Sequence, residues 1–403
     1  MNKSSEYFLD MVGRFARGEK PMPCPAGASF EELKKLSAKH SLSGIVGYMV
    51  RMLPENERPS GELYKFFAGS YIGTMKTVAN RVAAADACRV ALCANRIPSI
   101  YMKGYVLKDY YPFPELRSFG DVDILIHEKD RAAATQIMTA LGYDHLSDII
   151  FVDGYRRGDS ALEIHSQLFH NNFAGADFIK YFSTAWDNKL PFDDTGYAFT
   201  FNNEYHLIYL FVHLAKHAYH VGAGVRLFLD FDFYLKKHPD LDFEYLWSEL
   251  DKISLTTFAK KVFCVCNRFF GTKIPPDCGS LSDEVYEEFS EFILAGGTFG
   301  FSNSERDAED RLIRSNMKKG RSKFAVKFFS TMSLAFPPYS RMRHGYKFLD
   351  GHPYLLPIVW VMRVFTLFGS KKNKARARLK KVTRVDDSTI RHYELLSEIG
   401  LDD

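Results

Sequence analysis

The chain has 403 residues, of which 46% are hydrophobic and 25% are charged. These values lie near the averages of soluble globular proteins, so they exclude a disordered, collagen-like or membrane-spanning chain, and the length favours two or three domains. The net charge of +4 is too small to identify a nucleic-acid-binding protein, so nucleic acid is not the expected partner, although it is not excluded.

The cysteines and the apolar segments indicate a cytoplasmic protein. The six cysteines include no pair of CxxC elements and no dense framework, which predicts reduced thiols. The N-terminus lacks the apolar stretch of a secretory signal, so we expect no export. The longest apolar segment, Tyr354 to Phe368, is shorter than the roughly 20 residues that span a bilayer and contains Arg363. We therefore expect a buried or interfacial helix there and no transmembrane segment.

Residues 1–95 are predicted to form an N-terminal helical segment. Apolar residues recur at a spacing of three in Phe30 to Leu36, and the stretch from Val78 to Cys93 is rich in Ala, Val and Arg. The connection at residues 21–27 contains three prolines and a glycine, and it separates the first helix from the next. No motif in this segment indicates chemistry.

Residues 96–200 are predicted to form a small α/β core. The expected elements, in chain order, are a strand at 97–102, a helix at 105–111, a strand at 121–127, a helix at 129–141, and strands at 148–152 and 160–167. We expect a polar turn through Gly154 and Gly158 between the last two strands.

Residues 201–403 are predicted to form a C-terminal helical domain with breaks at prolines and glycines. No repeat of fixed period is present, so a solenoid is not expected. The predicted fold class is therefore α+β, with a small mixed sheet between two helical segments.

Asp121 and Asp123 are the first residues whose pattern indicates chemistry. Side chains two apart in a strand point to the same face, so both carboxylates lie on one side of the predicted strand. Mg²⁺ prefers oxygen ligands and is commonly held by one or two carboxylates together with substrate phosphates. A DxD triplet alone is also common by chance, so its context has to support the assignment.

Two further features supply that context. Lys103 and Gly104 lie where a predicted strand meets a helix, a place at which backbone N–H groups and the helix dipole favour phosphate. Glu163 lies on the strand predicted at 160–167, which we expect to lie beside the strand that carries Asp121 and Asp123. Three acids on neighbouring strands would permit two metal ions to bind the attacking and leaving oxygens of an in-line displacement.

Several segments follow one another in an order and spacing typical of one family. They are MKGYVL at 102–107, YYP at 110–112, Arg117, DVDILI at 121–126, LGY at 141–143 and LEIH at 162–165. With these segments the sequence resembles the uncharacterised nucleotidyltransferases of the DNA-polymerase-β-like superfamily. HLAKH at 213–217 and LD at 229–230 extend the resemblance to about residue 240. Segments 336–337 and 356–360 are similar to the family's helical tail.

The resemblance implies that Asp121, Asp123 and Glu163 hold Mg²⁺ or Mn²⁺ and that the Lys103-Gly104 turn lies near the triphosphate. The wider superfamily usually has Gly-Ser at this turn, so the phosphate contact must be redistributed here. Lys103 either supplies it electrostatically or points into solvent.

Arg117, four residues before the acids, has a planar guanidinium that suits phosphate. Three roles remain open for it. It can bind phosphate, lock Asp121 in place, or cap the preceding turn.

Residues 204–220 are predicted to form a helix capped by Asn203, with its apolar side chains on one face. Four histidines fall on the other side, and this histidine stripe consists of His206, His213, His217 and His220. Three interpretations remain open. The stripe faces solvent, lines an active-site cleft in which Lys216 or His217 meets the nucleotide or acceptor, or binds zinc.

The predicted reaction is transfer of a nucleoside monophosphate from a nucleoside triphosphate to an acceptor, with release of pyrophosphate. The acceptor is expected to be a hydroxyl or phosphate of a small molecule, peptide or protein. One alternative is a catalytically degenerate nucleotide-binding or interaction protein. The other is a surface-binding adaptor that uses the basic runs at 318–323 and 371–381.

Overall fold

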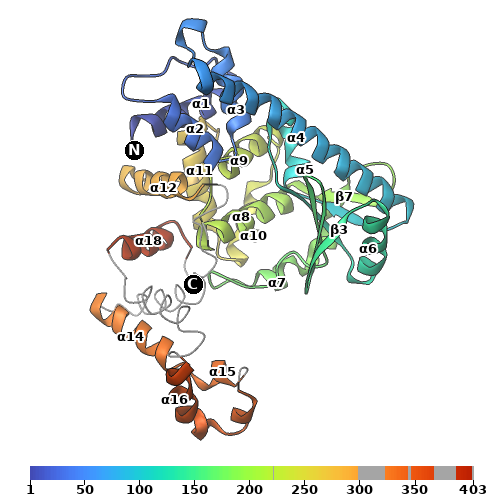
Figure 1. Cartoon of the computed structure of the whole chain (residues 1–403), viewed down its shortest axis with the longest axis vertical. Helices are drawn as coiled ribbons and strands as arrows, with labels where there is room; N and C mark the ends of the chain where they lie inside the picture. The colour runs from blue at the N-terminus through green and yellow to red at the C-terminus, as the bar shows by residue number, and fades with distance from the viewer. Residues whose placement is uncertain (221, 298–322, 344–345, 367–386, 402–403) are drawn as a thin grey trace. The chain divides into compact units, whose positions relative to one another are not determined.

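The computed structural model describes residues 1–220, 222–297, 323–343, 346–366 and 387–401 (Figure 1). The chain forms two compact units, one of residues 1–301 with 398–403 and the other of residues 302–397. The basic run at 371–381 and most of the run at 318–323 lie outside the described residues. The division of the chain at residues 95 and 200 stays a proposal.

The first unit begins with helices. They are α1 (Lys3–Arg17), α2 (Phe30–Lys39), α3 (Ser43–Met52) and the 34-residue α4 (Gly61–Ala94). The Asn2 side chain accepts a hydrogen bond from Ser5 N at the start of α1, and Gly18 ends this helix in the left-handed conformation. Figure 1 shows α4 running from these helices alongside the sheet.

A seven-stranded mixed sheet forms the middle of this unit, with the strand order β3-β4-β5-β2-β1-β7-β6. The strands are β1 (Ser99–Tyr101), β2 (Asp121–Ile126), β3 (Asp144–Ile149), β4 (Val152–Arg157), β5 (Ser160–His165), β6 (Lys189–Pro191) and β7 (Ala198–Phe201). The short α5 (Gly104–Leu107) and α6 (Arg131–Ala140) follow β1 and β2, and α7 (Phe178–Tyr181) precedes β6. β2 is parallel to β5 and antiparallel to β1.

One face of the sheet is covered by α4 and α6. Val122 and Ile124 of β2 and Leu162 of β5 belong to a buried cluster that also contains Cys88 of α4 and Met138 of α6. Because strand residues alternate between faces, this packing turns the intervening acids of β2 and β5 to the opposite face. The alternation in the sequence therefore decides which face carries the candidate chemistry.

Helices complete the first unit after the sheet. They are α8 (Asn203–His220), α9 (Val225–Lys237), α10 (Phe243–Lys252), α11 (Thr256–Phe270) and α12 (Asp283–Gly296). Residues from α8 and α9 line a cavity together with residues of β2, so these two helices lie over the acidic face of the sheet.

The second unit is helical in its described part. It contains α14 (Lys323–Ala335), α15 (Tyr339–Met342), α16 (Leu356–Thr366) and all but the last residue of α18 (Asp387–Glu398). Met342, Leu349 and Val359 form a small buried cluster. Within the described part of the chain, no helix is long and apolar enough to cross a membrane.

The predicted α+β class, with a mixed sheet and helical flanks, is confirmed. The predicted turn through Gly154 is wrong, because this glycine lies within β4 and pairs with Glu163 of β5. Arg131 of α6 holds β4 in place by binding the buried Asp153 through Nε and Nη2, at 2.8 and 2.9 Å. This long-range ion pair overrides the local preference of glycine for turns.

Three other predicted details change. The strand expected at 148–152 instead covers the end of β3, the turn at residues 150–151 and the start of β4, and β4, β6 and β7 were not predicted. The cap of α8 is Asn202, whose Oδ1 accepts a hydrogen bond from Tyr205 N at 2.9 Å, and Asn203 is the first helical residue. Both asparagines suit a cap chemically, so the sequence alone does not separate them.

Candidate active site

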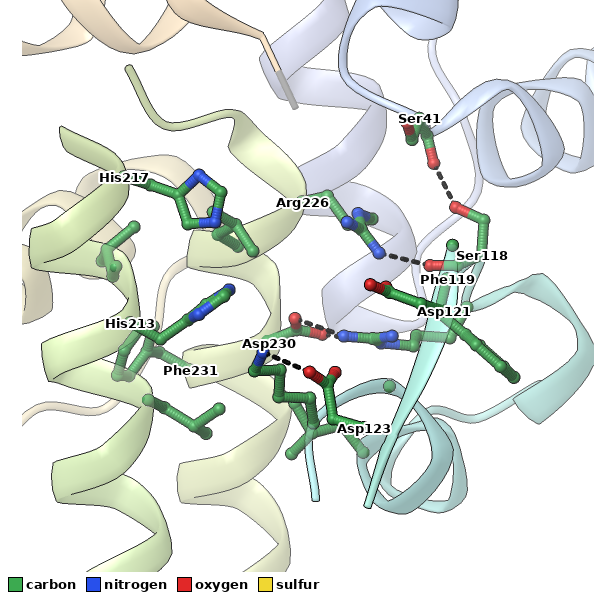
Figure 2. Close-up of a pocket in the computed structure, with 18 of the residues that line it drawn as sticks. Ser41, Ser118, Phe119, Asp121, Asp123, His213, His217, Arg226, Asp230 and Phe231 are labelled. Carbon is green, nitrogen blue, oxygen red and sulfur yellow. Dashed lines mark hydrogen bonds and ion pairs between the residues drawn. The ribbon is translucent and has the colours of Figure 1, made fainter. Parts of the chain in front are cut away.

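Parallel pairing brings the acids of two strands together. Asp123 of β2 lies opposite Glu163 of β5, and Leu125 lies opposite His165. Asp121 and Asp123 share one face of β2, as predicted, and Figure 2 shows both side chains projecting into a cavity. Glu163 and His165 occupy the corresponding face of β5, because the residue between them belongs to the core on the other side.

The cavity has a volume of about 320 Å³ and is lined by β2, the loop before it, α5, α8 and α9. The predicted site residues among its lining are Lys103, Gly104, Arg117, Asp121, Asp123 and His217. Glu163 and Lys216 are not lining residues, and the side chain of Glu163 is 42% exposed. The structure therefore gathers most of the predicted set around one cavity and leaves these two beside it.

Lys103 neutralises Asp123. Its Nζ lies 2.7 Å from Asp123 Oδ1, and the Asp123 side chain is only 3% exposed. Burial alone would raise the pKa of Asp123, but Lys103 and His165 outweigh burial and hold that pKa well below its usual value. The interpretation that Lys103 points into solvent is wrong, since its side chain is 20% exposed and ion-paired.

Asp121 has the opposite electrostatic environment. Repulsion from Asp123, followed by burial, raises the pKa of Asp121 to about 6, and Glu163 adds to this repulsion. Lys103 offsets only part of the effect. Part of the negative charge at this end of β2 is therefore left uncompensated, as expected of a site for a cation.

The His165 imidazole lies close to the carboxylates of both Asp123 and Glu163. Its Nε2 lies 3.2 Å from Asp123 Oδ1 and 3.5 Å from Glu163 Oε2. One ligand atom from each of Asp123, Glu163 and His165 lies within 4.8 Å of the others. The carboxylates provide the hard oxygen donors that Mg²⁺ and Mn²⁺ take, so these residues fit a divalent cation. His165 is part of the LEIH segment noted above, but it had been given no role.

Arg117 is tied to α9 by a buried ion pair. Its Nε and Nη2 lie 3.1 and 2.7 Å from the two carboxylate oxygens of Asp230, and Tyr111 donates its hydroxyl hydrogen to the same carboxylate at 2.7 Å. Its partner is thus Asp230 and not Asp121. The remaining Nη1 has no hydrogen-bond partner among the described residues. The two N–H groups of Nη1 are therefore available to an anionic ligand.

Gly104 is required by this arrangement. A Cβ at residue 104 would lie 2.5 Å from Arg117 Nη1 and 2.6 Å from Phe119 Cβ. The glycine therefore permits the close approach of α5 to the loop before β2.

Two further arginines line the cavity that sequence reasoning did not assign. Arg81 of α4 donates to the carbonyl of Phe119, and Arg226 of α9 donates to the carbonyl of Ser118. Burial, and next the charge of Arg117, lower the pKa of Arg226 to about 10, which keeps it protonated at neutral pH. No sequence motif links these residues, because α4, the loop and α9 meet only in the folded chain.

The histidine stripe divides into two environments. His206 is 1% exposed and packs against the rings of Phe201 and Tyr234, so it belongs to the core. His213 and His217 line the cavity opposite the acids (Figure 2). Burial, followed by the charge of Lys103, lowers the pKa of His213 well below its usual value.

The structure thus decides between the three interpretations of the histidine stripe for some of its residues. Lining of the cavity holds for His213 and His217, and solvent exposure does not hold for His206. Among the described residues the stripe forms no group of three metal ligands. Lys216 is exposed, and the side chain of His220 lies outside the described residues.

The comparison with protein families agrees with the resemblance. A family model described as "uncharacterised nucleotidyltransferase" matches residues 27–271. No curated protein matches. The chain is similar to a solution structure of the antibiotic-resistance factor ANT(2'')-Ia, with 13% identity and a TM-score of 0.32 over 43% of this chain and 90% of that one. It is also similar to a crystal structure of ANT(2'')-Ia in complex with adenylyl-2''-tobramycin, with 12% identity and a TM-score of 0.24 over 47% of this chain and 97% of that one.

Proposed function

This chain belongs to the uncharacterised nucleotidyltransferase family, and from that premise we propose a metal-dependent transfer of a nucleoside monophosphate from a nucleoside triphosphate to an acceptor. The observation that carries the proposal is a cavity whose lining contains both the carboxylates of Asp121 and Asp123 and the guanidinium groups of Arg81, Arg117 and Arg226. Such a site suits a metal-bound triphosphate, whose transfer depends mainly on positioning and charge neutralisation. Nucleoside triphosphates are supplied in the cytoplasm, where we place the protein.

Asp121, Asp123 and Glu163 are the proposed holders of Mg²⁺ or Mn²⁺. A bound divalent cation would neutralise the triphosphate and polarise the phosphoryl group under attack. The Lys103 ammonium lies 2.7 Å from Asp123 Oδ1, so it would have to leave this oxygen for a metal ion to bind there. A phosphate of the triphosphate would then be the acceptor for the Lys103 ammonium.

The remaining cations would hold the phosphates. Arg226 and Arg81 line the cavity while their side chains also anchor the loop before β2, and Arg117 offers its unpartnered Nη1. Guanidinium groups suit phosphate oxygens because their N–H donors form a fixed planar fork. Gly104 admits the phosphates close to the backbone, and Lys216 and His217 are proposed to meet the nucleotide or acceptor.

The reaction forms one bond and breaks another. An oxygen of the acceptor hydroxyl or phosphate attacks the α-phosphorus, the bond from that phosphorus to the bridging oxygen breaks, and pyrophosphate leaves with both bonding electrons. Glu163 would take the proton of a hydroxyl acceptor, since its partly exposed carboxylate lies beside Asp123 at the edge of the site.

The test uses each of the four ribonucleoside triphosphates, labelled at the α-phosphate, with Mg²⁺ or Mn²⁺ and a pool of small-molecule and peptide acceptors. We expect wild type to release pyrophosphate and to label a product with at least one triphosphate. Asp123→Asn should lose at least about 10²-fold in rate, the scale of losing one electrostatic stabiliser. Asp109→Asn, which changes an exposed carboxylate outside the cavity lining, should retain the wild-type rate. Equal rates in wild type and Asp123→Asn would overturn the proposal.

A further inference from the structure

We propose that His165 is a nitrogen ligand of the metal site formed by Asp123 and Glu163, and that this site therefore takes Mn²⁺ in preference to Mg²⁺. The inference rests on the proposed function, in which these two carboxylates hold a divalent cation. It adds a residue that the expected triad of Asp121, Asp123 and Glu163 does not contain.

The register of the sheet places the three ligands around one point. Asp123 pairs with Glu163 across parallel strands, and His165 follows Glu163 by two residues on the same face of β5. His165 Nε2 lies 3.2 Å from Asp123 Oδ1 and 3.5 Å from Glu163 Oε2. Adjacent ligands of an octahedral ion with bonds of about 2.1 Å lie about 3 Å apart. The observed separations are therefore close to those required, and small side-chain movements suffice.

A positive charge, the Lys103 ammonium, already lies at Asp123 Oδ1. Lys103 Nζ lies 2.7 Å from Asp123 Oδ1, the same oxygen that His165 Nε2 faces. A cation that replaces the ammonium would meet this oxygen, the imidazole nitrogen and the Glu163 carboxylate together. His165 is 12% exposed, so its ring is held near this point by its surroundings.

A second histidine of the same sheet, His145, lies near a single carboxylate and provides a comparison for His165. His145 Nε2 lies 3.4 Å from Asp153 Oδ1, but Arg131 already binds both oxygens of that carboxylate. No second carboxylate is paired with His145 among the described ion pairs. His165 differs because its nitrogen faces two carboxylates. His145 is therefore the matched control.

The donor set decides the preferred ion. Mg²⁺ takes oxygen ligands and water almost exclusively, whereas Mn²⁺, a first-row transition-metal ion that also prefers oxygen donors, accepts an imidazole nitrogen more readily than Mg²⁺ does. Replacing one oxygen donor by His165 thus lowers the affinity for Mg²⁺ relative to Mn²⁺. Both ions still accept the two carboxylates.

The test measures Mn²⁺ binding in the absence of nucleotide by electron paramagnetic resonance. Competition with Mg²⁺ gives the relative affinity of the two ions, and pulsed measurements detect nitrogen bound to Mn²⁺. Wild type should show nitrogen coupling and a Mn²⁺ affinity at least about tenfold above that for Mg²⁺. His165→Gln, whose amide can still donate a hydrogen bond to Asp123, should lose the coupling and about tenfold in Mn²⁺ affinity. Its Mg²⁺ affinity should change little. His145→Gln should match wild type.

The same measurements are made in a Lys103→Met protein, in which the ammonium that competes for Asp123 Oδ1 is removed. This variant should bind Mn²⁺ more tightly than wild type and show the same nitrogen coupling. Bound Mn²⁺ without nitrogen coupling in both backgrounds, no Mn²⁺ binding in either, or an unchanged Mn²⁺ to Mg²⁺ preference in His165→Gln would overturn the proposal. These measurements need no turnover. A chain that binds Mn²⁺ through His165 but releases no pyrophosphate would instead contradict the proposed function.

Discussion

Lys103 combines backbone strain with a strong side-chain interaction. Its φ of 51° and ψ of −130° place it in a region that residues with a Cβ rarely adopt. Such conformations cost on the order of 1–3 kcal/mol and persist where the surrounding structure enforces them, often at functional sites. The Lys103 side chain forms an ion pair with the buried Asp123. This pair holds the ammonium at Asp123 Oδ1, the oxygen proposed to bind the metal.

Replacing Lys103 by Met should destabilise the ligand-free protein by about 3 kcal/mol, because it leaves a buried carboxylate without its cation. Saturating Mn²⁺ should restore most of this loss, since the ion supplies the missing charge. Melting curves with and without Mn²⁺ measure both effects. Lys129→Met, at an exposed position, should melt like wild type. A Lys103→Met protein as stable as wild type without metal would show that the pair does not neutralise Asp123.

Asp121 should give the ligand-free protein a characteristic pH dependence. Its pKa of about 6 in the folded chain lies above the ordinary value of 3.8, so the folded state binds its proton more tightly than the unfolded state does. The contribution of Asp121 to stability is therefore fully present below about pH 4 and is lost as the pH rises through 6. The repulsion from Asp123 is the main cause.

Asp121→Asn should remove the loss of stability that wild type undergoes as the pH rises through 6. The variant should be more stable than wild type at pH 7.5 by on the order of 2 kcal/mol, and the difference should vanish near pH 4. Urea denaturation between these two pH values, with chelator present, measures the difference in the free energy of unfolding between the variant and wild type. With Mn²⁺ the order should reverse, because wild type gains more from the ion. A less stable variant at pH 7.5 without metal would mean that Asp121 has a stabilising partner.

At the scale of elements, the loop before β2 is the part that positions the acids. Arg81 of α4 and Arg226 of α9 bind its carbonyl groups, and Arg117 of the loop binds Asp230 of α9. A buried pair of this kind is strongly destabilising to break, since the remaining partner is an uncompensated charge. The direction of β2, and therefore of its carboxylates, depends on helices far away in the sequence.

Gly104→Ala tests this packing between elements. The added Cβ would overlap Arg117 Nη1 and Phe119 Cβ, at 2.5 and 2.6 Å, so α5 or the loop must shift. We expect a loss of about 1–3 kcal/mol in the free energy of unfolding, the usual cost of overpacking, and a lower rate of nucleotidyl transfer. Gly69→Ala is the control, because nothing lies within 4 Å of its added Cβ in α4. That change should be neutral or stabilising by up to about 1 kcal/mol. A Gly104→Ala protein with wild-type stability and rate would refute the close approach.

At the scale of the whole molecule, the residues of the proposed site lie in one of the two compact units, that of residues 1–301 with 398–403. The unit of residues 302–397 contributes none of them. Its described part exposes large apolar side chains, including Phe328, Phe336 and Ile358. The basic run at 371–381 belongs to this unit by sequence.

Deleting residues 371–381 should change the dissociation constant of the nucleoside triphosphate by less than about twofold at 0.15 M salt, because the run lies far in sequence from every proposed ligand of the nucleotide. Titration of a fluorescent triphosphate measures it. Arg226→Gln, in the cavity lining, should weaken binding much more strongly and serves as the positive control. A deletion that loses affinity as strongly as Arg226→Gln would place the nucleotide near the basic run.

The sequence by itself determined the local part of the site. Alternation of Asp121 and Asp123 with aliphatic residues specifies a strand and the face that carries the acids, because strand geometry has a period of two. The motif order also identified the family and the α+β class, since both depend on segments that can be read along the chain. The same local reasoning misassigned Gly154, whose strand is held by an ion pair from α6.

Only the tertiary structure decided which groups surround these acids. Arg117 and Asp230 are 113 residues apart, and Arg81 reaches a carbonyl 38 residues away, so neither contact follows from periodicity. The histidine stripe has one helical spacing, yet His206 lies in the aromatic core whereas His213 lines the cavity. Helical periodicity defines a face of a helix but not what packs against it. The environment along that face is set by helix packing over the sheet, and this depends on the whole chain.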